Sequence, residues 1–431
     1  MYILLIIYFL LFVFISVKNL KYGIYWLVFT LPAYLIRFEI FGLPTTLLEG
    51  EILLIFLIWF LKMLKYQNIK ALKQKLVSKD LLLLYYFITL LLITSIVSIF
   101  VSPDFYVALG IWKAYFLEPI LLFIVFVSVI KKQDLKNIFT VFSAQIFILS
   151  LFAIYQKLTG ALITNPFWAD EATRRVTSFF PYPNALALYI APIFILLLGY
   201  LIGLFKKNRK FFVVLLLYHF ITLILGFLAV CFTGSKGALF AIIAGLIFYT
   251  LFYKGKRKIF VGILIIIFIT LLFYCFITRA SIANILQGAS TVEGGDSIST
   301  RLEMWSETWQ MLKTKPIFGA GLAGYQTAVA SFHAKDYIEV YLYPHNIFLN
   351  LWTEIGLPGL FAFIAIIMYF FIYGFKKSDN YSVIIMSSMV VLLAHGLVDV
   401  PYFKNDLSVL FWIILGFMII NIKYKKYEIE K

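Results

Sequence analysis

Long apolar runs alternate with short polar connections along the whole chain. A run of about twenty apolar residues crosses the roughly 30 Å of hydrocarbon in a bilayer, and backbone groups in lipid must be paired within a helix. The pattern predicts an all-α polytopic integral membrane protein of twelve to thirteen transmembrane helices. The thirteen expected spans are 2–17, 22–36, 48–64, 80–101, 106–130, 136–157, 182–205, 211–232, 236–253, 259–278, 346–375, 380–400 and 406–422.

The longest polar interruption runs, with its edges, from Arg279 to Glu354. It opens with RASIANILQGASTVEGGDSISTRLEMWSETW, passes through KPIFGAGLAGYQ and closes with LYPHNIFLNLWTEIGLPG. We expect one transmembrane domain over residues 1–431, with residues 279–345 as a long extracytoplasmic loop. Because so apolar a chain has no structural need for this segment, we interpret it as an active site on the outer face.

The eleventh span is too long for a straight crossing. From His345 to Phe375 there are 31 residues, which correspond to about 46 Å of helix. Gly356, Pro358 and Gly359 lie one third of the way along it and favour a break. We expect His345–Ile355 to be a separate helical piece at the outer interface; the alternative is one long tilted helix.

Charge sets the orientation and excludes one class of partner. The chain carries 37 Lys and Arg against 21 Asp and Glu, for a net charge of +16. The basic residues form short clusters between spans and not one face, which argues against nucleic acid as a partner. Cytoplasmic loops hold the excess of Lys and Arg, so we place 25 of the 37 inside, the N-terminus outside and the C-terminus inside.

Composition removes further alternatives. With 63% hydrophobic residues the chain is far from a soluble average. Its two cysteines, Cys231 and Cys275, lie in or at the ends of spans and offer no disulfide framework or zinc spacing. The first segment lacks a basic region and a small-residue cleavage site, so we expect a retained helix there and not a signal peptide.

Arg301 is the first candidate for chemistry. Thr300 and Glu303 have the spacing of a capping box, which predicts Arg301 at the first helical position, beside unpaired N–H groups that favour an anion. The alternative is an arginine that pairs with Glu307 or with lipid headgroups. The helix is expected to be amphipathic, since apolar residues recur at helical spacing: Leu302, Trp305, Trp309 and Leu312.

The segment Gly319-x-Gly321-x-x-Gly324 has the form of a dinucleotide fingerprint. It follows a helix ended by Pro316 and not a strand of a βαβ unit, which argues against a nicotinamide cofactor. The spacing favours a turn whose amides dock the loop against the membrane domain.

Other charged residues stand at the outer edges of spans. Arg174 and Arg175 precede a helix start at Pro183 and Asn184. Outer arginines oppose the inside preference of positive charge, so diphosphate binding competes with simple headgroup contact. Lys236 occupies an outer turn in TGSKGALF.

Lys113 and Glu118 lie within the fifth span. Five residues separate them, which is about 140° around an α-helix, so we do not expect them to pair with each other. A carboxylate inside a span is a functional candidate, with helix packing as the competing explanation.

The chain has four histidines. His219 is expected to be a hydrogen-bonded structural residue, His333 carries no signal, and His395 has Asp399 four residues beyond it. His345 stands at the outer start of the eleventh span, beside Pro344 and Asn346. The motif spacings of zinc sites are missing, so no metal is expected.

At this point a family resemblance is evident. RLEMWSETWQMLKTKPIFGAGLAGYQ followed by PHNIFLNLWTEIGLPGL resembles the hallmark region of the O-antigen ligase and polymerase superfamily. The similarity extends in order to GIWKAYFLEP, RRVTSFFPYPNALALYIAP, GSKGALFA and AHGLVDVPYFKNDL, with Lys236 where many members carry Arg. These are bacterial multi-span proteins that act on lipid-linked glycans at the periplasmic face.

The resemblance implies a metal-independent, inverting glycosyltransferase of the inner membrane without a cofactor. It would move a glycan from an undecaprenyl-diphosphate carrier to a hydroxyl acceptor such as lipid A–core, in lipopolysaccharide biosynthesis. Carried over by motif, the diphosphate-binding cations would be Arg175, Lys236 and Arg301, with Arg174 beside them. His345 would be the base, and the supporting residues would be Asp399, Glu118, Lys113 and Asn346.

Other functions compete with this interpretation. A polysaccharide polymerase or a protein O-oligosaccharyltransferase of the same superfamily would use the same outer machinery. A multi-span transporter would show inverted repeats and paired broken helices, whereas the sequence offers one such break. A scaffold would have no need for outer arginines on separate loops.

The orientation gives a first testable prediction. In a cysteine-free background, Asp296→Cys is expected to react rapidly with an impermeant thiol reagent in spheroplasts, and Lys256→Cys only after the membrane is opened. Rapid labelling of position 256 in intact spheroplasts would reverse the assignment.

Overall fold

The structure is a computed structural model, which describes residues 2–40, 43–65, 79–204, 211–255, 262, 297–333, 340–377 and 379–429. Helices dominate it, as the apolar runs predict. Seven of the described helical segments are long and apolar enough to cross a membrane: Leu81–Val101, Phe105–Val129, Lys132–Thr159, Pro183–Gly203, Val213–Thr233, Ile347–Lys377 and Asn405–Ile422. The chain is a multi-pass, all-α membrane protein.

Helical segments occupy twelve of the thirteen expected spans, and span 259–278 falls outside the described residues except for Gly262. Span 22–36 consists of a ten-residue helix and a following 3-10 helix, Leu31–Leu35. Span 380–400 is shorter than expected, because its helix ends at His395.

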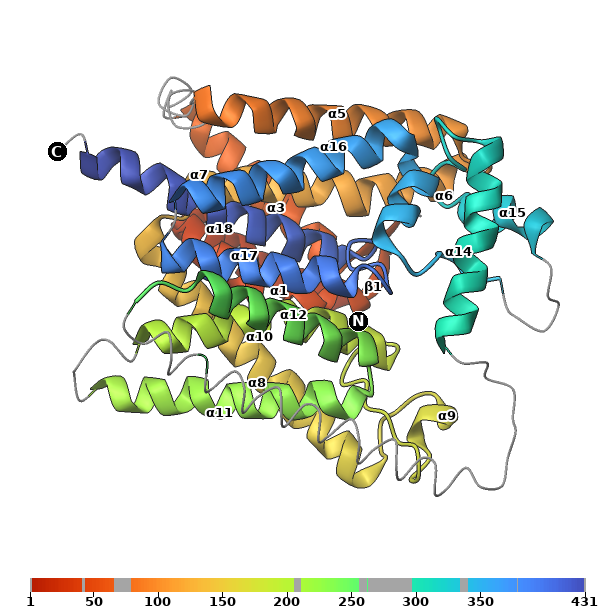
Figure 1. The fold of residues 1–431 in the computed structure, drawn as a ribbon. Coiled ribbons are helices and arrows are strands. Elements are labelled where there is room, and N and C mark those ends of the chain that lie inside the picture. The colour runs from red at the N-terminus through yellow and green to blue at the C-terminus, as the bar shows by residue number, and fades with distance from the viewer. Residues whose placement is uncertain are drawn as a thin grey trace. The chain divides into compact units, whose positions relative to one another are not determined.

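The described chain divides into two compact units. The first comprises residues 1–132, 295–376 and 396–431. Its elements are α1 (Tyr2–Lys18), α2 (Leu20–Phe29), β1 (Arg37–Ile40), β2 (Leu43–Thr46), α3 (Leu47–Lys65), α5 (Lys79–Val101), α6 (Phe105–Trp112), a π-helical turn (Lys113–Leu117), α7 (Glu118–Val129), α14 (Ser297–Thr314), α15 (Tyr325–Val329), α16 (Ile347–Lys377) and α18 (Asn405–Ile429). Within this unit, β1 and α14 lie at the same end of the helices (Figure 1).

Polar side chains join the first three helices of this unit. The buried Glu51 of α3 accepts hydrogen bonds from Thr30 Oγ1 at 2.8 Å and from Tyr8 of α1. Tyr8 in turn accepts one from Trp26 Nε1 of α2, at 2.7 Å. At the other end of α3, the Lys62 ammonium donates to the Val17 carbonyl. A buried carboxylate among apolar helices needs such partners, and here they fix the first hairpin of helices.

The second unit comprises residues 133–294 and 377–395. Its described elements are α8 (Leu135–Thr159), α9 (Pro166–Ala169), α10 (Pro183–Leu204), α11 (Phe211–Thr233), α12 (Lys236–Phe252) and α17 (Asn380–His395). Pro183 stands at the first position of α10, as the sequence predicts. His219 is buried and its Nδ1 lies 2.8 Å from Ser143 Oγ, which confirms the structural role expected of it.

The long eleventh span is broken where the glycines and proline predict. Gly356 has φ 73° and ψ 175°, so two helical pieces meet there at a kink within α16. The first piece begins at Ile347, and Asn346 caps it by accepting hydrogen bonds from the amides of Phe348 and Leu349 at 3.0 and 3.1 Å. The prediction of a separate piece before Gly356 is confirmed.

The capping-box prediction for Arg301 is wrong. Helix α14 begins at Ser297, four residues earlier, so Thr300 is helical and Arg301 lies in the second turn. The S/T-x-x-E spacing occurs inside helices as well as at their starts. In α14 the helix already includes Ser297 and Ser299, which precede Thr300. Arg301 is therefore not beside the unpaired N–H groups of a helix start, and its setting must come from tertiary contacts.

The glycine-rich turn docks the loop on the membrane helices, as the sequence predicts. Ala320 N donates to Thr353 O at 2.7 Å, and Leu357 N donates to Ile317 O at 2.9 Å. Ala323 N donates to the buried carboxylate of Glu354 at 2.7 Å. These bonds join residues 317–323 to both sides of the break in α16.

Glycine is required at this contact for steric reasons. Gly319 has φ 67°, and a Cβ there would lie 2.4 Å from the carbonyl oxygens of both Trp352 and Thr353. A Cβ on Gly356, which has φ 73°, would lie 2.3 Å from Ile317 O. Backbone atoms cannot move away without breaking the docking bonds.

These contacts predict that Gly319→Ala destabilises the protein by roughly 1–3 kcal/mol. The measurement is the thermal transition of the purified protein in detergent. The matched control is Gly203→Ala in α10, where a Cβ meets no atom within 4 Å and the helix gains roughly 0.5–1 kcal/mol. Equal transition temperatures for the two variants would contradict the docking role.

Candidate functional site

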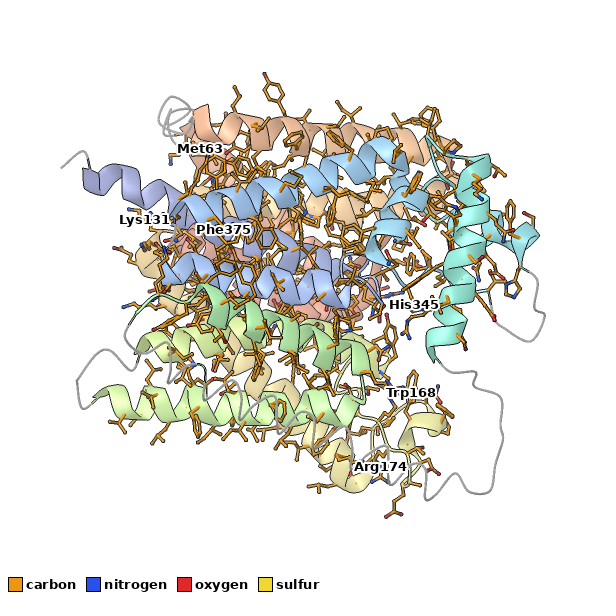
Figure 2. The ribbon with its side chains drawn as sticks, viewed as in Figure 1. Met63, Lys131, Trp168, Arg174, His345 and Phe375 are labelled. Carbon is orange, nitrogen blue, oxygen red and sulfur yellow. The ribbon has the colours of Figure 1, made fainter. Side chains whose placement is uncertain are left out.

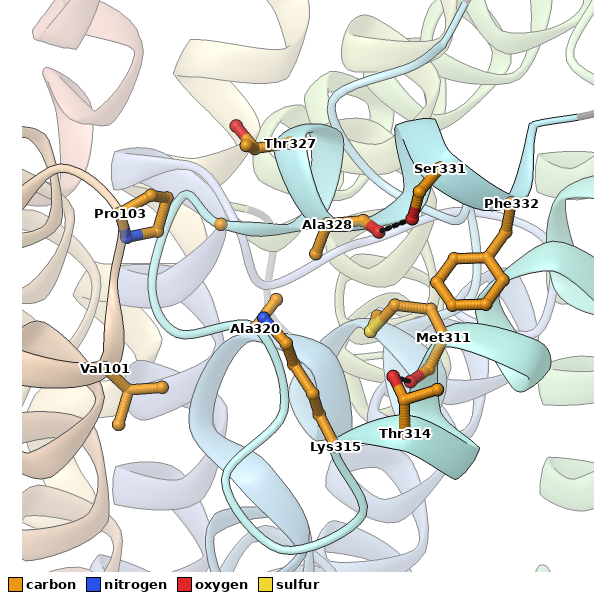
Figure 3. Close-up of a pocket in the computed structure, with 11 residues that line it drawn as sticks. Val101, Pro103, Met311, Thr314, Lys315, Ala320, Thr327, Ala328, Ser331 and Phe332 are labelled. Carbon is orange, nitrogen blue, oxygen red and sulfur yellow. Dashed lines mark hydrogen bonds between the residues drawn. The ribbon is translucent and has the colours of Figure 1, made fainter.

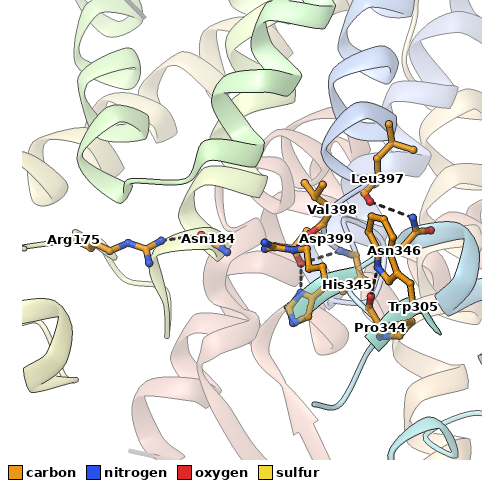
Figure 4. Close-up of polar contacts among 11 residues, drawn as sticks. Arg175, Asn184, Trp305, Pro344, His345, Asn346, Leu397, Val398 and Asp399 are labelled. Carbon is orange, nitrogen blue, oxygen red and sulfur yellow. Dashed lines mark hydrogen bonds and ion pairs between the residues drawn. The ribbon is translucent and has the colours of Figure 1, made fainter. Parts of the chain in front are cut away.

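A histidine–carboxylate pair lies at the start of α16. His345 Nδ1 is 3.3 Å from Asp399 Oδ1, and the two residues are 54 positions apart in the sequence (Figure 4). The His345 side chain is 30% exposed and that of Asp399 is 6% exposed. With the Nδ1 proton directed at the carboxylate, Nε2 is the acceptor atom of the ring. The imidazole is thus oriented by a buried group and remains accessible to a substrate.

The backbone at His345 is held in an uncommon conformation. Its φ is 47°, in the left-handed region that costs a non-glycine residue of order 1–3 kcal/mol. The neighbouring segments fix it: Ile347 N donates to Gly396 O at 2.7 Å, and Asn346 Nδ2 donates to Leu397 O at 3.1 Å. Strained residues of this kind concentrate at functional sites. Asn346 acts here on the turn that carries Asp399 and not on the imidazole.

Helix α14 brings Arg301 to the same turn. Arg301 Nε donates to Val398 O at 2.9 Å, one residue before Asp399. Trp305, one turn further along α14, donates from its Nε1 to Pro344 O at 2.9 Å, one residue before His345. The first unit therefore brings together three residues that the sequence indicated as separate candidates: Arg301, His345 and Asp399.

The apolar face of α14 supports this arrangement. Met311 and Leu312 are buried with Ala320, Tyr325 and Val329 in one cluster. Burial raises the pKa of the Tyr325 phenol to about 12, and its oxygen lies 3.0 Å from Thr308 Oγ1. Leu302 and Trp309, which the amphipathic pattern also included, are exposed.

A second group of cations lies in the other unit. Arg175 Nε donates to Thr233 O at 2.7 Å, and its Nη2 donates to Asn184 Oδ1 at 3.0 Å (Figure 4). Thr233 ends α11, and three residues later the exposed Lys236 begins α12. Ser235 caps this helix by accepting a hydrogen bond from Ala238 N at 3.4 Å. Arg175 and the turn that carries Lys236 are therefore joined directly.

Arg174 is turned to different partners. Its Nε donates to Ala169 O at 3.1 Å and its Nη1 donates to Lys157 O at 3.0 Å, beside α9 (Figure 2). Both contacts are to backbone carbonyls and hold the short α9 segment against the end of α8. A substrate role for Arg174 stays a prediction.

The prediction that Lys113 and Glu118 do not pair is wrong. Lys113 Nζ lies 3.9 Å from Glu118 Oε1 and 2.8 Å from Glu49 Oε2. Residues 113–117 form a π-helical turn, in which each residue lies above the one five positions before it. The extra residue in this turn brings positions 113 and 118 to one face, which an α-helix would not do.

Several polar residues of this unit were missed from the sequence. Glu49 is buried and binds Lys113, and the ammonium nitrogen of the half-buried Lys404 is shielded from water near the charges of Asp406 and Asp399. Burial lowers the pKa of Lys404 to about 8, and the two carboxylates partly oppose that shift. The sequence could have indicated Glu49, because a carboxylate inside an apolar span marks a functional or paired position.

A cavity of about 370 Å³ separates the loop elements from the end of α5 (Figure 3). Val101 and Pro103 line one side, and Met311, Ala328 and Phe332 line the other. Lys315 is the one charged residue among the described residues that line it. This cavity offers little chemistry compared with the His345 pair.

The remaining histidines do not join the site by the contacts described. His333 Nδ1 lies 3.1 Å from Glu307 Oε2. Glu307, which the sequence analysis gave as an alternative partner for Arg301, therefore contacts a histidine. Helix α17 ends at His395, and Asp399 therefore lies outside the helix that was expected to present both. Among the described residues, no group of three or more His, Cys, Asp and Glu side chains is arranged to hold a metal ion.

Comparison with known proteins finds a family model that matches part of the chain. A search of curated proteins finds no match. Residues 220–364 match the family model described as O-antigen ligase, and this range contains Lys236, Arg301, His345 and the docking turn. This match supports the resemblance to the O-antigen ligase superfamily that the sequence motifs indicate.

Proposed function

We propose that the protein transfers a glycan from an undecaprenyl-diphosphate carrier to a hydroxyl group of an acceptor, at the outer face of a bacterial cytoplasmic membrane. The observation that carries this proposal is the His345–Asp399 pair with Arg301 bound one residue away. An accessible base beside a fixed cation is what the reaction requires. The O-antigen ligase match supports the general class of activity.

His345 is the general base in this proposal. The acceptor hydroxyl oxygen attacks the anomeric carbon of the donor sugar while His345 Nε2 takes the hydroxyl proton. The bond between the anomeric carbon and the phosphate oxygen breaks, and its electron pair leaves with the diphosphate. Asp399 accepts the hydrogen bond from the Nδ1–H group of His345 and stabilises the imidazolium that forms.

The cations neutralise the leaving group. A diphosphate gains negative charge as the glycosidic bond breaks, and fixed guanidinium groups stabilise that charge. Arg301 is anchored at Val398 O by its Nε, and Arg175 is anchored at Thr233 O by its Nε. Both anchors restrict the arginine side chains before substrate binds. We propose that Arg301, Arg175 and Lys236 act on one diphosphate, without a metal ion.

Ligation and polymerisation differ in the acceptor. We propose ligation to a cell-surface acceptor such as lipid A–core, with polymerisation of repeat units and transfer to protein as the alternatives. The deciding experiment is mass analysis of surface glycans in a deletion strain. Loss of attachment with retained chain length identifies a ligase, whereas single-unit products identify a polymerase.

We predict that Arg301→Ala and Arg175→Ala each reduce turnover by roughly 10²-fold or more, because each leaves the diphosphate charge uncompensated. The Lys variants are expected to retain part of the activity, since an ammonium cannot copy the bidentate guanidinium. Transfer is measured with purified protein and lipid-linked donor, with and without a chelator. Lys313→Ala, an exposed position on the same helix as Arg301, is the control. Full activity in both Arg→Ala variants would remove these residues from the site, and a strict Mg²⁺ requirement would contradict the metal-independent scheme.

A further prediction concerns the base. His345→Ala and His345→Gln are expected to lower transfer by roughly 10²–10⁴-fold at normal membrane abundance. Asp399→Asn is expected to give a smaller loss, because the imidazole loses its orienting charge and keeps its position.

His333→Gln is the matched control for this prediction. His333 forms the same kind of Nδ1–carboxylate contact, with Glu307 at 3.1 Å, and is outside the proposed machinery. It should retain near-normal transfer. If His345→Gln does so as well, His345 is not the base.

A further inference from the structure

The first unit contains a second cavity that the proposed reaction does not use. It has a volume of about 480 Å³, within the range of small-molecule sites, and is lined by the β1–β2 hairpin, α6 and the π-helical turn. The lining residues that matter here are polar: Arg37, Glu39, Thr45, Glu49, Lys113 and Asn405. Four of these six come from the segment 37–49, which the sequence analysis treated only as a connection and the start of a span.

Glu49 organises the polar groups of this cavity. Its Oε2 accepts hydrogen bonds from Lys113 Nζ at 2.8 Å and from Thr45 Oγ1 at 3.0 Å. Its Oε1 accepts one from Asn405 Nδ2 at 2.8 Å. The Glu49 carboxylate is buried, so these contacts are shielded from water. Lysine, threonine and asparagine side chains from three different segments are thereby held in fixed positions.

The charge balance of the cavity selects the type of ligand. Arg37 and Lys113 are offset by Glu39 and Glu49, so the lining has no net charge. A second carboxylate, Glu118, lies 3.9 Å from Lys113. A diphosphate would meet two or three carboxylates here, which like-charge repulsion disfavours. A neutral ligand that needs both donors and acceptors is favoured.

Sugars meet this requirement. Each hydroxyl donates one hydrogen bond and accepts others, so a sugar site needs both kinds of partner. Arg37 and Lys113 donate, Glu39 accepts, and Asn405 does both. Apolar surface from Val107, Ile111 and Ala114 completes the lining, which suits the C–H faces of a sugar ring.

The cavity is tied to the His345 pair within the same unit. Tyr115 lines the cavity, and Tyr343 lies two residues before His345. The rings of Tyr115 and Tyr343 also both contact Phe403, with centroids 6.1 and 5.8 Å away. Asn405 lies six residues after Asp399. Two short segments therefore connect the cavity wall to the proposed base and its carboxylate.

From these observations we infer that the cavity under the β1–β2 hairpin binds the sugar hydroxyls of the acceptor glycan, as a site separate from the cations that bind the diphosphate. The identification of this sugar as the acceptor rests on the proposed function. The binding of a neutral sugar in this cavity does not depend on that function. A protein acceptor would instead place a peptide here.

The test uses Gly110, which lines the cavity from α6 and whose added Cβ meets no atom within 4 Å. Gly110→Trp is expected to fill the cavity without disturbing the fold. The KM for acceptor glycan should rise at least about tenfold, with the KM for donor and the kcat at saturating acceptor unchanged. Glu39→Gln, on the exposed hairpin, should raise the acceptor KM in the same direction. Gly203→Trp in α10, another position with open space, is the control.

A binding measurement separates this inference from the proposed function. Saturation-transfer NMR of the purified wild type with a panel of methyl hexosides and methyl heptosides should show binding signals that Gly110→Trp abolishes and Gly203→Trp retains. If the wild type lacks transfer activity but this pattern is seen, the proposed function fails and the sugar site stands. If transfer occurs and Gly110→Trp leaves both the acceptor KM and the NMR signals unchanged, the sugar site is wrong and the proposed function stands. Absence of any glycoside signal, or a Gly110→Trp variant that stops binding only pyrophosphate or only a Ser/Thr peptide, would also overturn the assignment.

Discussion

The break in α16 at Gly356 is the feature on which the first unit's site depends. A continuous helix from Ile347 to Lys377 would have no turn at which Ile317 O and Leu357 N could meet. The left-handed conformation of Gly356 ends the short helical piece and opens its backbone to the docking turn. Because that piece begins at Ile347, two residues after His345, the break that docks the loop also helps to fix the position of the imidazole. The position of the proposed base and the attachment of the loop that follows α14 are therefore linked through one backbone conformation.

Buried polar groups in this unit act in pairs that link distant segments. Removing a charge from water is costly unless another group binds it, so each carboxylate in the apolar helices specifies its neighbours. Glu51 specifies the packing of α1 and α2 on α3, and Glu49 specifies the positions of Lys113 and Asn405. Asp399 specifies the position of His345, and the His345 side chain remains partly exposed. The first pairs stabilise the fold, and the last leaves one nitrogen of the ring available.

The sequence predicted the features that depend on local chemistry. Apolar length located the spans, and Gly356 with Pro358 located the break, because both signals act within a few residues. It failed where a local signal has two structural meanings. The spacing from Thr300 to Glu303 occurs within α14 as well as at a helix start, and the separation of Lys113 from Glu118 changes meaning in a π-helical turn. The His345–Asp399 pair depends on how two segments 54 residues apart are packed, which no local pattern contains. Family motifs named both residues, but only the fold supplies their contact.

The two polar regions of the first unit differ in a way that follows from their charges. Arg301 and the His345–Asp399 pair place a cation and a base at one turn, where an anionic leaving group would be stabilised. The hairpin cavity balances its cations with carboxylates, so it offers that leaving group no net attraction and suits a neutral glycan. A transferase with one uniformly positive cleft would bind its charged carrier wherever the cleft allowed, including across the acceptor position. Under the proposed scheme, the carboxylates beside Lys113 would prevent this error, because they remove the net positive charge that would attract a diphosphate to the acceptor cavity. The buried Glu49, which contributes nothing to bond breaking, is in this view the residue that keeps donor and acceptor in separate places.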